Sequence, residues 1–256
     1  MSFLVVISSA KTMTDKAKKK FATFTQPEFL NEAKKINHTL RELNAPQIES
    51  LMQINPQLAR LNLDRIHNWH TDTNQNNALQ AIFSYTGEVY RGVNVQSYTE
   101  QDLLFAQDHL RILSGLYGIV RPLDLILPYR LDMGTSFSVE KYKNIYEVWQ
   151  NKVTASLEKH MKEKKINTLI NLASNEYFSV LDTSKLSCKI ITPVFYELSG
   201  DQLKTIVVYV KKARGLMTSF IMKNRIDDPD DLKNFNQAGY SFYPEVSDEN
   251  KWVFVR

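Results

Sequence analysis

Several short, wholly apolar runs in this sequence end abruptly in polar residues, and this pattern limits the fold more than any other. Residues 3–7 are Phe-Leu-Val-Val-Ile, and Ser8-Ser9-Ala10-Lys11-Thr12 follows at once. Residues 168–172 end in the same way before Ala173-Ser174-Asn175-Glu176-Tyr177. Such runs are typical of strands buried on both faces in the sheet of an α/β protein. Further strands are predicted at 189–195, 205–210, 240–243 and 252–255.

Longer segments carry the period of amphipathic helices. Thr99 with Asp102, and Asn144 with Glu147, are typical capped helix starts. Because the first half is helix-rich after one strand and the second alternates strand with helix, one compact mixed α/β domain with a central sheet is favoured over two domains. The predicted helices are 27–43, 46–54, 56–66, 99–113, 144–161 and one that follows residue 210.

Composition excludes several classes of protein. The 256 residues are 43% hydrophobic and 23% charged, as in a globular protein, and no run approaches the eighteen or so apolar residues of a membrane span. The first residues are too few and lack the basic start of a signal peptide. Cys188 is the single cysteine, which excludes an internal disulfide and suits a cytoplasmic location.

The net charge of +4 is modest, but the charges are segregated along the chain. Residues 11–20 and 203–226 are basic, whereas acidic residues gather at 227–231 and 245–249. Segregation of this kind can build a cationic face for a polyanion, although the lysines of 16–20 are equally typical of a solvated loop.

The turn Gly115-Leu116-Tyr117-Gly118 lies between an apolar run ending at Leu113 and the basic segment 119–126. Glycines allow the backbone to approach a partner closely, so residues 100–130 are interpreted as a helix-hairpin-helix-like element, with a plain helix–helix connection as the alternative. Its glycines are three apart rather than the usual two. The residues expected to contact DNA are Arg111, Gly115, Tyr117, Gly118, Arg121 and Arg130.

Polar residues that follow parallel strands meet at one edge of the sheet, where ligands gather near helix N-termini. If residues 3–8, 168–172 and 205–210 are parallel neighbours, one basic cleft results. Gly215, beside Arg214 in the following helix, indicates close approach of either a ligand or another helix. The cleft residues are Ser8, Lys11, Thr12, Asn171, Ser174, Asn175, Lys211, Lys212 and Arg214, with Glu176 as the candidate acid/base.

Blocks spread over nearly the whole chain resemble the YaaA peroxide-stress proteins of bacteria. The longest runs from Phe105 through Ser114-Gly115-Leu116-Tyr117-Gly118 and Arg121-Pro122-Leu123-Asp124 to Pro128-Tyr129-Arg130-Leu131-Asp132-Met133-Gly134. Shorter ones are Ser8 to Thr12, Asn171 to Phe178, Lys211 to Met217, Phe235-Asn236 and Gly239-Tyr240. One departure is Ser9, where the family usually has Pro.

The resemblance implies a cytoplasmic protein of the hydrogen peroxide response, associated with limiting unincorporated iron. It also implies a single-domain α/β fold with a basic cleft, a helix-hairpin-helix-like element and binding to duplex DNA. Phosphate contacts carry no base information, so binding is expected to be largely sequence-independent and weakened by salt. No settled enzymatic activity comes with the resemblance.

Two readings of the function therefore stay open. The first is a non-enzymatic DNA-binding stress protein, and the second is an enzyme that acts on a nucleotide- or nucleobase-like small molecule in the basic cleft, with Glu176 as the candidate base. Ser174-Asn175-Glu176 is equally typical of a simple helix cap. No cofactor or metal site is predicted, because His67 and His70 are explained as well by surface positions beside Trp69.

Overall fold

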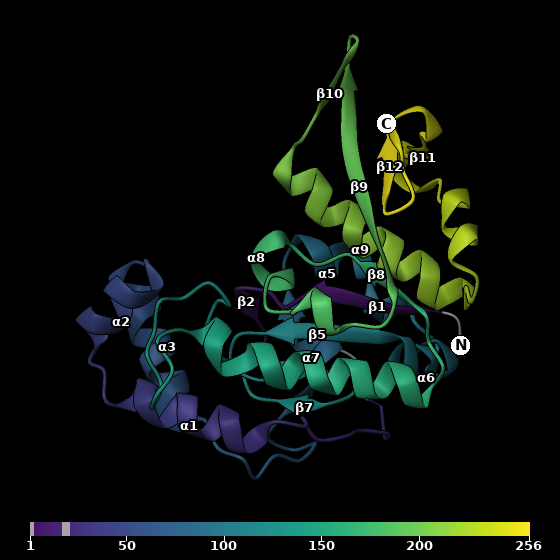
Figure 1. Cartoon of the computed structure of the whole chain (residues 1–256). Coiled ribbons are helices and arrows are strands. Elements are labelled where there is room, and N and C mark those ends of the chain that lie inside the picture. Colours follow the sequence, from purple (N-terminus) through teal and green to yellow (C-terminus); the bar gives the residue numbers. More distant parts are fainter. Residues whose placement is uncertain (1–2, 17–20) are drawn as a thin grey trace.

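The chain folds around a mixed β-sheet, and the computed structural model describes residues 3–16 and 21–256 (Figure 1). The strands of this sheet are β1 (Phe3–Ser8), β5 (Leu110–Ser114), β6 (Gly118–Val120), β8 (Thr168–Asn171), β9 (Lys189–Ser199), β10 (Gln202–Lys204), β11 (Ser241–Phe242) and β12 (Lys251–Val255). Their order is β11-β12-β9-β8-β1-β5-β6, with β10 paired to β9. The five central strands are parallel, and β6, β10 and β11 are antiparallel to their neighbours.

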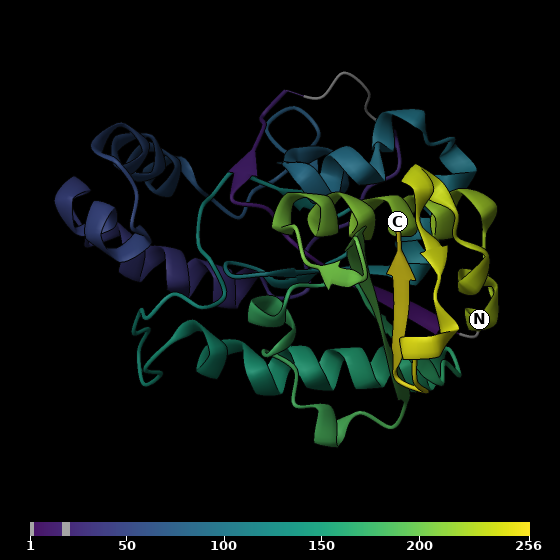
Figure 2. The same cartoon turned by 90° about the horizontal axis from the view of Figure 1, so that it is seen from above.

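Helices cover both faces of the sheet, with α7 on one face and α5, α6 and α9 on the other (Figures 1 and 2). The helices are α1 (Leu30–Arg41), α2 (Ala45–Met52), α3 (Pro56–Asn68), α4 (Ala81–Ser84), α5 (Glu88–Val93), α6 (Glu100–His109), α7 (Ile145–Glu163), α8 (Asn175–Phe178) and α9 (Val207–Asn224). Two small ladders pair β2 (Thr12–Met13) with β4 (Tyr85–Thr86) and β3 (Leu79–Gln80) with β7 (Leu125–Ile126). The predicted α/β class with a central sheet is confirmed.

The parallel centre of the sheet follows from the apolar runs. All six residues of β1 are buried, because β5 and β8 flank the strand and helices cover both of its faces. Two predicted helix starts are also confirmed. Thr99 caps α6 with a capping box to Asp102, and the Asn144 side chain accepts a hydrogen bond from Glu147 N at the start of α7.

Two parts of the chain project from this central body. Helices α1 to α3 form a lobe at the left of Figure 1, and β9 continues past the sheet to form a hairpin with β10 at the top of the same view. Within the lobe, α2 and α3 pack as a helical hairpin joined by Gln53, Ile54 and Asn55. None of the described helices has the length and apolar character needed to cross a membrane.

The segment 205–210, predicted as a strand, is not one. The strand nearby is β10, and α9 begins at Val207. Val207 is 64% exposed on the first helical turn, so its side chain does not enter the core. The apolar run was misread because periodicity alone cannot separate a short strand from the start of a helix.

The predicted helix-hairpin-helix at 100–130 is wrong. Helix α6 ends at His109, and residues 110–114 form β5, which pairs in parallel with β1. β6 then returns antiparallel to β5, so the two-glycine turn closes a β-hairpin. The apolar residues from Leu110 to Leu113 fit either a helix or a strand. They form a strand because hydrogen bonding to β1 is available there.

Candidate functional site

The carboxyl ends of β1 and β8 meet, as the sequence predicts for parallel neighbours. Ser174 N donates to Ser8 Oγ at 2.9 Å, and Ser8 Oγ lies 3.3 Å from Ser174 Oγ. Ser174 also caps α8, because its Oγ accepts from Tyr177 N. Asn171 is buried, and its Oδ1 accepts from Ala173 N at 3.0 Å. These contacts fix the edge of the sheet next to Lys11 and Glu176.

The loop after β7 forms the next wall of this site. Lys11 Nζ pairs with Asp132 Oδ2 at 2.8 Å, and Glu176 Oε1 accepts from Gly134 N at 3.1 Å. A Cβ on Gly134 would come within 3.2 Å of Glu176 Oε1, so glycine keeps this carboxylate close to the loop. Lys11, Asp132 and Glu176 are therefore held by three separate segments of the chain.

The third wall comes from the end of α2. Its last residues face the loop across a pocket of about 550 Å³, a size suited to a small-molecule or nucleotide ligand. Gln53, in the turn to α3, has φ 49° and is exposed. We call this space the cleft pocket; it is lined by Lys11, Ser50, Leu51, Met52, Gln53, Arg130, Asp132, Gly134, Thr135, Ser136 and Glu176.

Arg130 is the least satisfied cation of the cleft pocket. Its Nε is buried without a hydrogen-bond partner, and no ion pair joins it to another described residue. A buried donor without a partner is costly, and an anionic ligand supplies an acceptor atom for this Nε. Lys11, by contrast, is already paired with Asp132, although its side chain is 57% exposed.

Buried tyrosines lie behind the cleft pocket. Tyr129 OH bonds Ser114 Oγ at 2.7 Å and Tyr85 OH at 2.9 Å, while Tyr177 OH lies 3.5 Å from Asp132 Oδ1. Ser9 hydrogen-bonds Tyr129 and Tyr177. Burial raises the pKa of all three tyrosines, so the phenols stay neutral.

Three buried tyrosines are packing groups rather than platforms on which bases could stack. Tyr117, Tyr129 and Tyr177 are all buried, and Tyr117 OH accepts from Trp69 Nε1 at 2.8 Å. Stacking on a nucleobase needs an accessible ring face, which these side chains lack.

The amides of the two-glycine turn are not free to bind phosphate. Gly115 and Gly118 are buried, Gly115 O accepts from Trp149 Nε1 at 2.8 Å, and Tyr117 N donates to Ser114 Oγ at 2.9 Å. A Cβ on Gly118, which has φ 70°, would overlap the Trp149 ring. Glycine is needed here for core packing, and the burial of this turn does not support the expected DNA contact through its amides.

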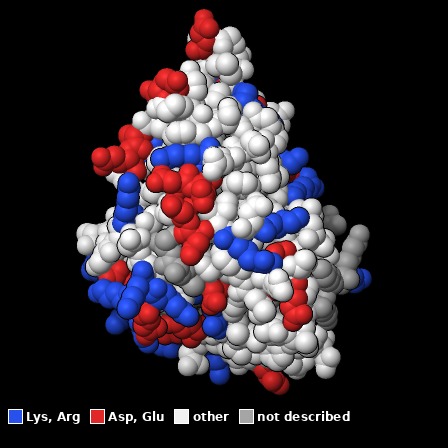
Figure 3. Space-filling model, turned by 90° about the vertical axis from the view of Figure 1, so that its right-hand side faces the viewer, with Lys and Arg blue, Asp and Glu red and all other residues white. Residues whose placement is uncertain are grey.

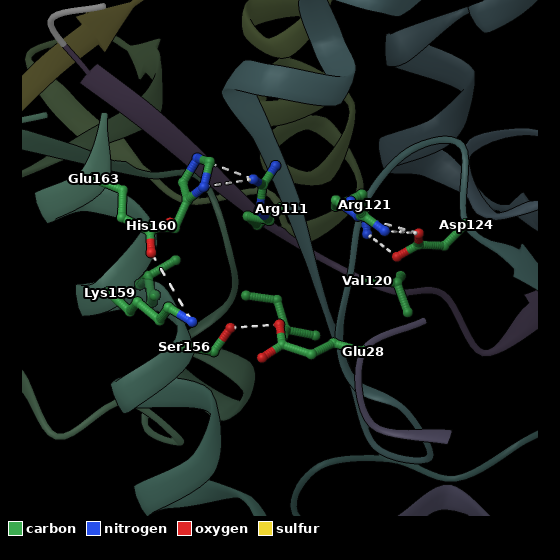
Figure 4. A pocket seen from close by; sticks show the side chains of 11 residues that line it. Glu28, Arg111, Val120, Arg121, Asp124, Ser156, Lys159, His160 and Glu163 are labelled. Carbon is green, nitrogen blue, oxygen red and sulfur yellow. Dashed lines mark hydrogen bonds and ion pairs between the residues drawn. The ribbon is translucent and has the colours of Figure 1, made fainter. Parts of the chain in front are cut away.

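Arg111 and Arg121 line a separate pocket of about 320 Å³ between the β5–β6 edge and α7 (Figure 4). Arg111 is only 7% exposed, and it donates to Gln107 O, Leu110 O and the His160 ring. Burial lowers the pKa of Arg111 to about 10, and burial together with Arg111 lowers the pKa of His160 to about 4. Arg111 therefore satisfies backbone carbonyls at the carboxyl end of α6 and does not extend into solvent.

Arg121 is occupied in a similar way. Its Nη2 pairs with Asp124 Oδ1 at 3.0 Å, and Asp124 Oδ2 accepts from Arg121 N at 2.7 Å. Asp124 is 1% exposed, and burial raises the pKa of its carboxyl. The structure thus separates Arg111 and Arg121 from Arg130, which the sequence had assigned to one surface.

The basic residues of α9 divide between solvent and packing. Lys211 and Lys212 are exposed, and neither forms an ion pair with another described residue. Gly215 packs directly on α5, since a Cβ there would overlap Val89 O, so the helix-packing alternative for this glycine is confirmed. Arg214 Nε is buried without a partner, and burial lowers the pKa of its guanidinium.

The expected segregation of charge into one cationic face is not visible on the side shown in Figure 3, where basic and acidic residues interleave. Lys16 is exposed, and Lys18 to Lys20 lie outside the described residues. Thr12 pairs with Thr86 in the β2–β4 ladder, and the exposed Asn175 opens α8.

Over residues 3–16 and 21–256, no three His, Cys, Asp or Glu side chains lie close enough to hold a metal ion. His67 lies in the last turn of α3, while His70 follows the helix, so the two do not share a helical face. Cys188 is half-buried, and burial raises the pKa of its thiol to about 11. Its thiolate form is disfavoured at neutral pH.

Sequence reasoning missed two parts of the cleft pocket. Asp132 and Gly134 stood in a block that had been singled out, yet no role was given to either. The end of α2 carries no charge and no motif, so only its position in space places it at the site. The Asn-Pro punctuation at 55–56 was the available signal, because it marks the tight turn between two short helices.

Comparisons with known proteins agree over almost the full length. A family model described as "Peroxide stress protein YaaA" matches residues 3–246. A protein of Cellvibrio japonicus is 44% identical over 253 residues, which is 99% of this chain and 98% of the relative. A Neisseria gonorrhoeae protein is 43% identical over 251 residues, covering 98% and 97%, and a Teredinibacter turnerae protein is 43% identical over 253 residues, covering 99% of both. All three relatives carry the name UPF0246 protein. The chain belongs to the YaaA family of peroxide stress proteins.

Proposed function

We propose that the protein serves the peroxide stress response by binding the phosphate backbone of duplex DNA at the cleft pocket. Family membership supports the peroxide stress role. Duplex DNA is the partner implied by the resemblance of the sequence blocks. The site of contact moves from the buried turn at 115–118 to the helical hairpin α2–α3 and the loop that faces it.

The observation that carries this proposal is the buried, unpartnered Nε of Arg130 beside the exposed turn of a helical hairpin. Arg130 offers a forked donor to a phosphate, and Lys11 lies in the same pocket with most of its side chain in solvent. Lys211 and Lys212 are further exposed cations, on α9. Together they provide charge contacts without any base-reading element.

The second candidate is a nucleotide-like small molecule bound in the same pocket, and one observation favours it. Glu176 is held through a single oxygen by Gly134 N, which leaves its other oxygen free to accept a hydrogen bond from a ligand hydroxyl or amine. A carboxylate so placed beside Arg130 can also act as a base. This candidate requires saturable binding of a mononucleotide without DNA.

One titration separates the two candidates. Fluorescence anisotropy of a labelled duplex, with unlabelled duplex or adenosine monophosphate as competitor, is compared for the wild type and Arg130→Met. The DNA proposal expects tight duplex binding that the mononucleotide displaces poorly and that Arg130→Met weakens. Displacement by the mononucleotide at lower concentration than by duplex would favour the small-molecule candidate instead.

The association with limiting unincorporated iron rests on the resemblance and is proposed only as part of the physiological role. In cells that lack the endogenous gene, the wild-type chain is expected to restore survival in hydrogen peroxide and to lower the unincorporated iron seen by whole-cell electron paramagnetic resonance. Arg130→Met, expressed to the same level, is expected to restore less of both. Full rescue by this variant would contradict a role for the cleft pocket.

A further inference from the structure

The pocket between the β5–β6 edge and α7 has a buried floor and an exposed rim (Figure 4). Its volume of about 320 Å³ lies at the lower end of the range for sites of single small molecules. The buried lining residues, which form the floor, are Arg111, Ile119, Val120, Asp124 and Leu157, and the exposed ones, which form the rim, are Glu28, Lys159 and Glu163. The pocket therefore presents Arg111 to a small ligand that enters from the rim.

Arg111 carries its positive charge at this floor without a carboxylate partner. Its Nη1 donates to Gln107 O and Leu110 O, and its Nη2 donates to the ring of His160. No described residue accepts a hydrogen bond from its Nε or forms an ion pair with its guanidinium. Buried arginines are usually paired, because a buried charge without a counter-charge is costly. The floor of this pocket therefore suits a negatively charged group.

His160 is the reason that the charge of Arg111 is not neutralised within the protein. Its Nε2 lies 3.0 Å from Arg111 Nη2, and the ring also hydrogen-bonds the backbone of Asp108. Burial and the charge of Arg111 lower the pKa of His160, so the imidazole stays neutral at pH 7. A glutamate at this position would give Arg111 an ion pair, whereas the neutral ring fixes the guanidinium and leaves its charge for a ligand.

Glu28 provides a charge of the opposite sign at the rim. Ser156 Oγ donates to its Oε2 at 2.6 Å, and no cation among the described residues pairs with its carboxylate. Figure 4 shows Glu28 and Ser156 at one side of the pocket and Arg111 and His160 at the other. The two charges of the lining that lack an ion pair are thus opposite in sign and border the same space.

The other charged side chains of the pocket pair with one another. Arg121 Nη2 lies 3.0 Å from Asp124 Oδ1, and Lys159 Nζ lies 3.9 Å from Glu163 Oε1. With His160 neutral, the lining holds as many carboxylates as cations. A balance of this kind disfavours a ligand with a net negative charge, such as inorganic phosphate, and favours one that carries both charges.

From this arrangement we infer that the pocket binds a small aliphatic α-amino acid as its zwitterion, with the carboxylate on Arg111 and the ammonium group on Glu28. A zwitterion gives each of these two groups a counter-charge and brings no net charge to a lining that is already balanced. Ile119, Val120 and Leu157 give an apolar surface for the aliphatic side chain. The pocket is separate from the cleft pocket, so the inference does not depend on the binding of DNA.

Isothermal titration calorimetry of the full-length protein at pH 7 tests the inference with three probes. L-Leucine carries both charges, 4-methylpentanoate lacks the ammonium group, and 3-methylbutylamine lacks the carboxylate. L-Leucine is expected to bind about tenfold more tightly than either of the others, because each truncated probe leaves one charge-assisted contact unmade. In nuclear magnetic resonance spectra, the Cε1–H signal of His160, identified by its loss in His160→Gln, is expected to shift as L-leucine is added.

Two variants test the two charges separately. Glu28→Gln removes the exposed carboxylate and is expected to weaken L-leucine binding about tenfold while leaving 4-methylpentanoate binding unchanged. His160→Glu supplies Arg111 with a carboxylate within the protein and keeps its contacts with backbone carbonyls, so it is expected to abolish binding of both probes. Glu245→Gln and His70→Glu, at exposed positions outside this pocket, are the matched controls and keep the wild-type affinity. Thermal melting checks that each variant folds.

Three results would overturn the inference. The first is equal affinity of the wild type for L-leucine and 4-methylpentanoate. The second is wild-type affinity for L-leucine in folded His160→Glu, which would place the ligand elsewhere. The third is the absence of both heat and a His160 shift at about 10 mM L-leucine, a concentration that nearly saturates a site with a dissociation constant of about 1 mM. The anisotropy titration of a duplex decides the proposed function separately, so failure of one is distinguishable from failure of the other.

Discussion

Arg130 differs from the other arginines of the predicted DNA surface in what surrounds its guanidinium. Arg111 donates to two carbonyls and a histidine, and Arg121 is paired with the buried Asp124. Binding of either guanidinium to a phosphate would break these contacts within the protein. Arg130 Nε has no hydrogen-bond partner, and the proposed binding of DNA therefore depends on this residue.

Replacing Arg130 by Met should therefore reduce duplex affinity without harming the fold. Loss of one charge-assisted phosphate contact is expected to weaken binding by about tenfold at low salt. Lys189→Met is the matched control. Lys189 is exposed at the amino end of β9, whereas the cleft pocket lies at the carboxyl ends of the neighbouring parallel strands. Anisotropy measures affinity and thermal melting the fold. Equal affinity of the two variants would contradict the role of Arg130.

His160 makes the stability of the fold dependent on pH. Burial and Arg111 lower its pKa to about 4 in the folded protein, below the value of about 6.5 in an unfolded chain. The unfolded state binds more protons between these values, so the contribution of His160 is complete above about pH 6.5 and is lost as the pH falls toward 4.

The variant His160→Gln tests this point. Its free energy of unfolding in urea is expected to fall less steeply than that of the wild type between about pH 6.5 and 4.5. Parallel curves for the two proteins over this interval would show that His160 does not titrate as the geometry around Arg111 requires.

The helices and strands that could be predicted from the sequence are those with a local signal, either an apolar run or a helix cap. β1, β8 and β12 are apolar runs, and the starts of α6 and α7 carry their own caps. Residues 110–114 could not be predicted, because their apolar residues fit either period and the partner strand β1 lies a hundred residues away. Long-range pairing, which sequence alone does not show, decided the conformation.

The same limit applies to the candidate site. The contact between Ser8 and Ser174 follows from two neighbouring parallel strands, so it could be predicted. The meeting of Lys11 with Arg130 could not, since the two had been assigned to different surfaces. The wall from α2 depends on how a separate helical hairpin is placed against the sheet, and no local pattern encodes that placement.

The close packing of α5 on α9 offers a test at the level of elements. Gly92 and Gly215 face each other, and a Cβ on either would overlap backbone of the other helix. Gly215→Ala is expected to lower the free energy of unfolding by about 2 kcal/mol despite the better helix propensity of alanine.

The double variant Gly92→Ala/Gly215→Ala serves as the check. Once the helices have been forced apart, the second methyl should cost less than the first, so the two effects should not add. Stabilisation by either single substitution, measured by chemical denaturation, would contradict the close contact.

For the whole molecule, the fold determines which basic side chains are left without a partner within the protein. The turn at 115–118 is inside the protein, and Arg111 and Arg121 are both held by partners within the protein (Figure 4). The cleft pocket brings Lys11 and the unpartnered Arg130 to the edge of the sheet, opposite the helical hairpin α2–α3. Phosphate binding at one cleft, rather than over a broad cationic face, is the expected behaviour of the protein.

The salt dependence of duplex binding tests this claim most directly. Each phosphate contact that is lost removes about one unit from the slope of log affinity against log salt. Affinities of the wild type and of Lys11→Met/Arg130→Met, measured by anisotropy over a series of salt concentrations, should differ at low salt and converge as salt rises, with a slope about two units shallower for the variant. Superimposable lines for the two proteins would show that DNA does not bind at the cleft pocket.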